Sequence, residues 1–241
     1  MLRVASYNIR KAVGLDWRRD AARIVDVLGE IDADIVVLQE ADKRLGARPG
    51  VLPETLLDEL GYRFIDYDKD TPSHGWHGNA MIYRPDRFDL SASRKIDLPA
   101  LEPRGSISAT FGPASFEVLG VHLGLTPGTR EKQIRHLARF VEAADHPVLI
   151  AGDFNSTLPN PKIAEKFSKS VHVLTPGPTF HAANPFASLD RFVLSGFGTP
   201  AQSHVHRSKL ARRASDHLPI VLEVPVTKAA QTHIGKDEEV E

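Results

Sequence analysis

Short apolar segments recur along the chain, separated by polar stretches that often contain glycine, proline or aspartate. Several of these segments are continuous rather than alternating, and they are rich in valine, isoleucine and phenylalanine. This pattern is typical of strands that are covered on both faces or packed between two sheets. The segments that predict strands are residues 2–9, 34–40, 79–84, 106–111, 116–123, 147–154, 189–195 and 218–224.

Three other segments have the spacing of helices. Residues 16–31 carry one apolar stripe at a period of 3.6 residues. Residues 53–61 begin at a proline, which suits a first helical position, and end at a glycine. Residues 129–144 place apolar side chains on one face. Helices interleaved with such strands predict an α+β or α/β sandwich.

The chain has 241 residues, which suits one large domain or two small ones. We see no repeat and no internal linker, so we expect a single domain over residues 1–226. Residues 227–241 are polar and end in an acidic cluster, which is typical of a disordered tail.

The overall charge and the missing cysteine narrow the class of protein. The net charge is −1, so no basic excess argues for a nucleic-acid partner, although a local basic patch is compatible with it. The absence of cysteine excludes disulfides, thiolate zinc sites and cysteine nucleophiles. The first residues lack a signal-peptide core, and no long apolar run could span a bilayer. We expect a cytoplasmic protein without stable membrane insertion, and we favour a monomer.

Polar side chains gather where the predicted strands begin or end. Each has an ordinary interpretation when taken alone: a turn residue, a solvated acid, a partly buried histidine or a helix cap. All of them lie at strand boundaries, where a rigid backbone commonly positions ligands and catalytic groups. We therefore interpret them as one site, made of Asn8, Glu40, His122, Asp153, Asn155, Asp190, Asp216 and His217.

The segment "VLIAGDFNS" illustrates this arrangement. An apolar run leads through Gly152 to an acid and an amide two residues apart. If extended geometry continued, Asp153 and Asn155 would share one face and Phe154 would point into the core. The alternative interpretation is a local turn in which the aspartate side chain binds the backbone.

Carboxylates and amides without thiols form a hard, oxygen-rich site, which prefers Mg²⁺ or Mn²⁺ to zinc. Neighbouring histidines can hold phosphate charge or protonate a leaving group near neutral pH. This combination suits metal-assisted hydrolysis of phosphoesters.

Seven motifs in order resemble the endonuclease/exonuclease/phosphatase (DNase I-like) superfamily, and in particular its short bacterial metal-dependent hydrolases. They are "SYNIR", "VVLQE", "GNAMIYR", "GVHLG", "AGDFNS", "LDRFVLS" and "SDHLPI". The resemblance implies an α+β fold: a four-layer α/β/β/α sandwich with two central mixed β-sheets. It also implies a Mg²⁺- or Mn²⁺-dependent phosphoric ester hydrolase.

The same resemblance implies a role for each site residue. Asn8, Glu40 and Asp216 match the residues at the metal. Asp153 matches the residue that orients or deprotonates the attacking water, and Asn155 matches a ligand of the scissile phosphate or the metal. The remaining matches are a phosphate-contacting histidine, its orienting acid and a histidine at the phosphate or leaving group, namely His217, Asp190 and His122.

Substrate and accessory residues stay open at this level. We favour a phosphodiesterase of the nuclease type acting on nucleic acid or on phospholipid-type headgroup esters; the alternative is a catalytically silent binding module of the same fold. The segment Arg207 to Arg213 and the helix start at Arg130 could bind phosphate or face solvent. Asn79 lies near the site, and Trp76 could stack on substrate or pack in the protein.

Overall fold

The structure, a computed structural model, describes residues 1–43, 48–67, 70–100, 105–112, 116–199 and 202–225. The predicted tail, residues 227–241, lies outside the described residues. No helix in the described part of the chain is long and apolar enough to cross a membrane.

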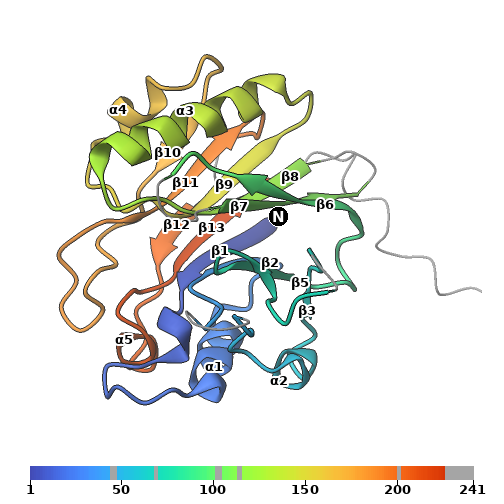
Figure 1. The fold of residues 1–241 in the computed structure, drawn as a ribbon, viewed down its shortest axis with the longest axis vertical. Helices are drawn as coiled ribbons and strands as arrows, with labels where there is room; N and C mark the ends of the chain where they lie inside the picture. The colour runs from blue at the N-terminus through green and yellow to red at the C-terminus, as the bar shows by residue number, and fades with distance from the viewer. Residues whose placement is uncertain (44–47, 68–69, 101–104, 113–115, 200–201, 226–241) are drawn as a thin grey trace, which may run out of the picture.

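Two mixed β-sheets form the centre of the molecule (Figure 1). The first has the order β12-β13-β1-β2-β5-β3, with β4 also paired to β5. Its strands are β1 (Leu2–Asn8), β2 (Ile35–Gln39), β3 (Arg63–Phe64), β4 (Gly75–Trp76), β5 (Asn79–Tyr83), β12 (Gln202–Val205) and β13 (Ile220–Val224). The second has the order β10-β11-β9-β8-β7-β6. Its strands are β6 (Leu90–Asp97), β7 (Gly105–Phe111), β8 (Phe116–His122), β9 (Val148–Asp153), β10 (His172–Leu174) and β11 (Asp190–Ser195).

Helices cover the outer faces of both sheets (Figure 1). The first sheet packs against α1 (Ala21–Ile31) and α2 (Glu54–Asp58), with α5 (Ala211–Ala214) beside them. The second sheet packs against α3 (Pro127–Ala143) and α4 (Asn160–Ala164). A short 3₁₀ helix, Arg10–Ala12, follows β1. This is the four-layer sandwich that the motif resemblance implied.

Alternating side chains on the strands fill three separate apolar layers. In β9, Leu149 and Ala151 face the first sheet, whereas Val148 and Ile150 face α3. Both faces of the strand are therefore buried, which explains why its sequence is continuously apolar. Transfer of this apolar surface from water is the main force that holds the layers together.

The sequence predicted the buried strands better than the exposed ones. The long strand β6 was missed because most of its residues are exposed and lack an apolar pattern. The helix predicted from residue 16 begins at Ala21, because the Asp20 side chain accepts a hydrogen bond from the Arg23 N–H at 3.1 Å and caps it. Before it, the Gly14 N–H donates to the Arg18 carbonyl and closes a turn.

The close approach of β8 and β9 requires a glycine at position 152. A Cβ there would lie 2.0 Å from the carbonyl oxygen of Val121 on the paired strand. We expect Gly152→Ala to lower the free energy of unfolding by about 1–3 kcal/mol, as overpacking commonly does. Gly128→Ala in α3 is the matched control, since no atom lies within 4 Å of that added Cβ. Urea denaturation of both variants measures this, and an equal effect would contradict the packing argument.

Candidate active site

The sheet topology brings the predicted site residues to one end of the sandwich. Strands β1 and β2 are parallel, so their carboxyl ends lie at the same edge of the sheet. Asn8 is the last residue of β1, and Glu40 directly follows β2. In the second sheet, β8 and β9 are parallel with His122 opposite Asp153, and antiparallel β11 begins with Asp190 opposite Asp153. Since β13 runs antiparallel to β1, the residues that precede it, Asp216 and His217, lie at this end as well.

Three side chains converge on one carboxylate oxygen, Asp153 Oδ2. The Asn8 Nδ2 donates to it at 3.2 Å, and the Nε2 atoms of His122 and His217 lie 3.6 and 3.7 Å away. The carboxylate is buried, and burial together with the charge of Asp190 raises its pKa. These two contacts are longer than hydrogen bonds, so each imidazole Nε2 remains able to bind a water or a substrate oxygen beside the carboxylate.

His217 is oriented from behind by a buried hydrogen-bond chain. Its Nδ1 lies 2.9 Å from Asp190 Oδ2, which also accepts a hydrogen bond from Thr179 Oγ1 at 2.5 Å. Burial opposes the charged form of His217, but the neighbouring carboxylates outweigh it and raise its pKa to about 9. This imidazole is therefore positively charged at neutral pH, with Nε2 directed to Asp153.

The segment after β9 combines both interpretations of the "DFN" sequence. Phe154 is fully buried, as expected. Asn155, however, has φ of 49°, so the extended geometry does not continue. Its backbone N–H donates to Asp153 Oδ1 at 2.8 Å, which is the turn interpretation, and its Nδ2 donates to the Leu123 carbonyl at 2.9 Å. The turn keeps both residues at the site: Asp153 and Asn155 line the same cleft.

The predicted metal-site carboxylates each face a basic side chain. Glu40 is paired with Lys11, and Asp216 lies 3.4 Å from Arg10 Nε. Asn8 and Glu40 line one cleft, and Ser215 Oγ ties Asp216 to this edge by donating to the Asn8 carbonyl at 2.7 Å. The side-chain oxygens of Asn8 and Glu40 are ligands of the kind that a hard divalent cation prefers. The Lys11 ammonium shows that a positive charge can lie against Glu40.

A second group could also hold a cation. One ligand atom each from Asp153, Asp190 and His217 lie within 4.8 Å of one another. In this group His217 Nδ1 and Asp190 Oδ2 are already engaged with each other. We therefore interpret this trio as the hydrogen-bonded pair of Asp190 and His217 with the carboxylate of Asp153 beside it.

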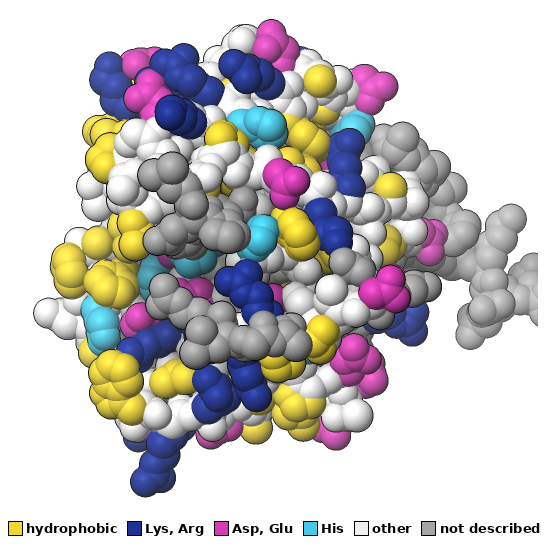
Figure 2. All heavy atoms as spheres, in the orientation of Figure 1, with side chains coloured by type: hydrophobic (Ala, Val, Ile, Leu, Met, Phe, Trp, Pro, Cys, Tyr) yellow, Lys and Arg dark blue, Asp and Glu magenta, His cyan; other side chains and the backbone are white. Residues whose placement is uncertain are grey.

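An open cleft of about 460 Å³ is lined by six of the eight predicted site residues, Asn8, Glu40, His122, Asp153, Asn155 and His217, whereas Asp190 and Asp216 are not part of its lining. Histidine and acidic side chains lie partly recessed on the face shown in Figure 2, with basic side chains close by. Several residues of the cleft have an unusual backbone conformation. A φ near +50° is found at Lys11, Glu40, Arg48, His77 and Asn155. Residues other than glycine in this region are uncommon, and such geometry clusters at functional sites.

The accessory residues considered from sequence have other contacts. Arg130 Nη1 donates to the carbonyls of Gly124 and Leu125, at 3.3 and 2.5 Å, and so holds the loop after β8. Asn79 Nδ2 donates to the Gly105 carbonyl at 2.9 Å. Trp76 packs against the core between the sheets and donates to Asp97, so it is a packed tryptophan.

Sequence reasoning missed the basic residues that line the cleft. It pointed to the segment from Arg207 to Arg213, whereas the described lining contains Lys11, Lys43 and Arg48, together with His77. The sequence feature that could have indicated them is the basic stretch "DKRLGARPG". It is separated from the predicted metal-site acid Glu40 by a single alanine.

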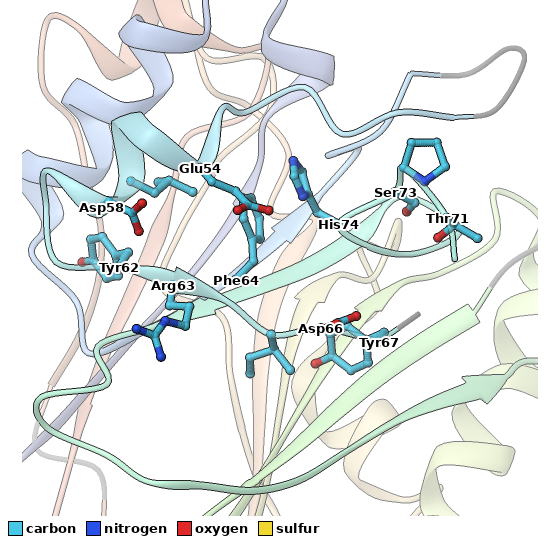
Figure 3. A pocket seen from close by; sticks show the side chains of 13 residues that line it. Glu54, Asp58, Tyr62, Arg63, Phe64, Asp66, Tyr67, Thr71, Ser73 and His74 are labelled. Carbon is cyan, nitrogen blue, oxygen red and sulfur yellow. The ribbon is translucent and has the colours of Figure 1, made fainter. Parts of the chain in front are cut away.

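The structure contains a second cavity of about 410 Å³ (Figure 3). It is lined by α2, β3 and residues 71–74. The rings of Phe64 and His74 stack there with centroids 3.9 Å apart, and His74 Nε2 lies 2.9 Å from the Leu52 carbonyl oxygen. These contacts fix the segment that leads to His77.

A family model matches most of the chain. The model described as "Endonuclease/Exonuclease/phosphatase family" matches residues 5–217. The chain belongs to this family. Members of the endonuclease/exonuclease/phosphatase family are hydrolases that act on phosphoesters. The matched range contains all eight predicted site residues.

Solved structures share the fold at low sequence identity. An endonuclease/exonuclease/phosphatase from Bacteroides vulgatus has a TM-score of 0.73 at 16% identity, covering 94% of this chain and 99% of that chain. The mannosyl-6-phosphatase Bt3783 of Bacteroides thetaiotaomicron has a TM-score of 0.68 at 20% identity, covering 93% and 100%. D. rerio TDP2 complexed with single strand DNA product has a TM-score of 0.69 at 20% identity, covering 92% and 97%. No curated protein sequence matches the chain significantly.

Proposed function

We propose that this member of the endonuclease/exonuclease/phosphatase family is a Mg²⁺- or Mn²⁺-dependent phosphodiesterase. The observation that carries the proposal is the convergence of Asn8, His122 and His217 on Asp153 Oδ2 at 3.2–3.7 Å. A buried base, flanked by a charged histidine and an amide, is suited to hydrolysis by an attacking water.

Asp153 is the residue that orients the attacking water and takes its proton, because its Oδ2 faces the open cleft with a raised pKa. His217 is kept protonated by Asp190 and donates to a phosphate oxygen as negative charge builds up. Asn155 binds the phosphate beside it, and His122 lies where it can donate to the leaving oxygen.

Asn8, Glu40 and Asp216 are the residues that would hold the divalent cation. When bound, such a cation polarises the phosphoryl group and neutralises its charge. Lys11 and Arg10, which face Glu40 and Asp216, balance these acids from the protein side.

The proposal is tested with a panel of nucleic-acid, lipid and sugar phosphoesters, assayed with Mg²⁺ or Mn²⁺ and with a chelator. We expect release of nitrophenol from bis(p-nitrophenyl) phosphate that the chelator abolishes. Silence across the whole panel would instead favour the alternative, a binding module of the same fold.

Replacement of the metal-site acid changes the metal requirement. We expect Glu40→Gln to raise the Mg²⁺ concentration for half-maximal activity by at least about 10-fold, because loss of a residue that merely supports a metal ligand already weakens metal binding by about 10–100-fold. Glu142→Gln, an exposed position on α3, is the matched control. Activity is measured over a Mg²⁺ titration, and an unchanged midpoint in Glu40→Gln would contradict the assignment of Glu40.

A further inference from the structure

One wall of the cleft is a basic hairpin that the hydrolytic residues do not use. Asp42 forms a bridge with Gly50, and the Lys43 N–H donates to the Pro49 carbonyl at 3.0 Å. Lys43 and Arg48 therefore lie on opposite arms of this hairpin, and both line the cleft that contains Glu40. Residues 44–47, which connect Lys43 to Arg48 in the sequence, are outside the described residues.

Arg48 is held by a histidine rather than by an acid. Its Nη1 lies 3.3 Å from His77 Nδ1. Arginine can only donate, so His77 accepts at Nδ1 and carries its proton on Nε2. Burial and the charge of Arg48 lower the pKa of His77, which keeps the ring neutral. Within the described part of the chain, neither Arg48 nor Lys43 forms an ion pair with a carboxylate.

Hydrogen bonds connect the hairpin to the segment that carries His77. Ser73 Oγ donates to Asp42 Oδ2 at 2.6 Å, which ties the hairpin to the segment before His77, and the Ala41 N–H donates to the Gly78 carbonyl at 2.9 Å. Ser73 and His74 also line the second cavity, as Figure 3 shows. Position 50 has room only for glycine, because a Cβ there would lie 1.8 Å from His74 Cδ2.

The backbone at this wall is strained as well as fixed. Arg48 and His77 have φ of 52° and 51°, a left-handed geometry that bulky side chains rarely adopt. The contacts of the hairpin maintain this geometry, and it directs both side chains to the cleft. Strain that the surrounding structure maintains is a common feature of ligand-binding positions.

A forked guanidinium, an imidazole N–H and an ammonium on one wall are the donors that bind phosphate. They repel a cationic headgroup. We propose that Arg48, His77 and Lys43 form a second phosphate subsite, so that the substrate is a phosphodiester with another phosphate beside the scissile one, as in an oligonucleotide. This inference rests on the proposed function, and it excludes a substrate whose only other charged group is a choline-type cation.

The cleft has the space that such a substrate needs. Its volume of about 460 Å³ lies within the usual range of roughly 300–1,000 Å³ for ligand pockets. The scissile phosphate would lie against Asp153 and His217, and the second one against Arg48, with the connecting sugar between them.

The kinetic test compares thymidine dinucleotides with and without a terminal phosphate, each assayed with Mg²⁺. The terminal phosphate is placed at the 5′ end in one substrate and at the 3′ end in another. For the wild-type protein, we expect one of these two substrates to have a kcat/KM at least tenfold higher than that of the dinucleotide without a terminal phosphate. Arg48→Met should lower this ratio at least fivefold, and Arg48→Lys should restore part of it. Arg139→Met, an exposed arginine on α3, is the matched control and should leave the ratio unchanged.

Each other outcome is decisive. No preference in the wild-type protein, or an equal loss on both dinucleotides in Arg48→Met, would overturn the subsite while leaving the proposed hydrolysis intact. If the wild-type protein cleaves neither dinucleotide, calorimetric titration separates the two claims. The subsite then predicts that thymidine 3′,5′-bisphosphate binds at least tenfold tighter than thymidine 5′-monophosphate, and that Arg48→Met removes this difference. Equal affinity of the two nucleotides would overturn it.

Discussion

Asp153→Asn is expected to lower kcat by about 10²–10⁴-fold, the contribution that a positioned general base commonly makes. The amide has nearly the same shape as the carboxylate, and its oxygen can still accept the hydrogen bond that the Asn155 N–H now makes to Oδ1. At the Oδ2 position it loses the ability to take a proton from water, and it also loses the hydrogen bond that Asn8 Nδ2 donates there at 3.2 Å. A stability measurement therefore accompanies the kinetics, to separate a loss of chemistry from a loss of folding.

The measurement is steady-state hydrolysis of bis(p-nitrophenyl) phosphate together with urea denaturation. The matched control is Asp26→Asn, an exposed position on α1, which should keep wild-type kinetics. A folded Asp153→Asn protein with kcat near the wild-type value would rule out Asp153 as the base.

His217→Ala is expected to lower kcat by about 10²–10³-fold, as removal of one preorganised charge-stabilising donor does. The imidazolium is buried against Asp190 and aimed at the oxygen on which Asn8 and His122 also converge. Since the truncation removes a buried ring, His217→Gln provides a second variant of similar bulk. His172→Ala, an exposed histidine on β10, is the control.

A double variant tests whether Asp190 acts through His217. Residues that act as one unit have non-additive effects on kcat. Asp190→Asn combined with His217→Ala should therefore be little slower than His217→Ala alone. Fully multiplicative losses would show that Asp190 acts independently of His217.

The sequence predicted the positions of those site residues that lie at the ends of buried strands. Continuous apolar runs identified β1, β2, β8, β9 and β11, and the polar residue at each end followed from them. Parallel pairing then places Asn8 beside the strand that leads to Glu40, and His122 beside Asp153. The strand ends follow from the local apolar pattern, which the sequence analysis used, whereas the pairing and register of the strands came from the structure.

The basic wall could not be predicted in this way, because it depends on contacts between distant loops. Arg48 reaches the cleft through a hairpin whose register is set by a bridge from Asp42 to Gly50 and by Ser73. His77 arrives on a segment fixed by stacking of His74 on Phe64. Likewise, the left-handed turn at Asn155 replaces the expected extended geometry because its N–H binds Asp153, a choice that alternation of residue types does not reveal.

The most direct test of the central claim is hydrolysis of bis(p-nitrophenyl) phosphate in ¹⁸O-labelled water, with Mg²⁺ and with a chelator, followed by mass spectrometry of both products. If Asp153 aims a water at phosphorus, one ¹⁸O atom appears in the p-nitrophenyl phosphate, none appears in the nitrophenol, and the chelator stops the reaction. Label in the nitrophenol, or undiminished turnover with the chelator present, would contradict the account.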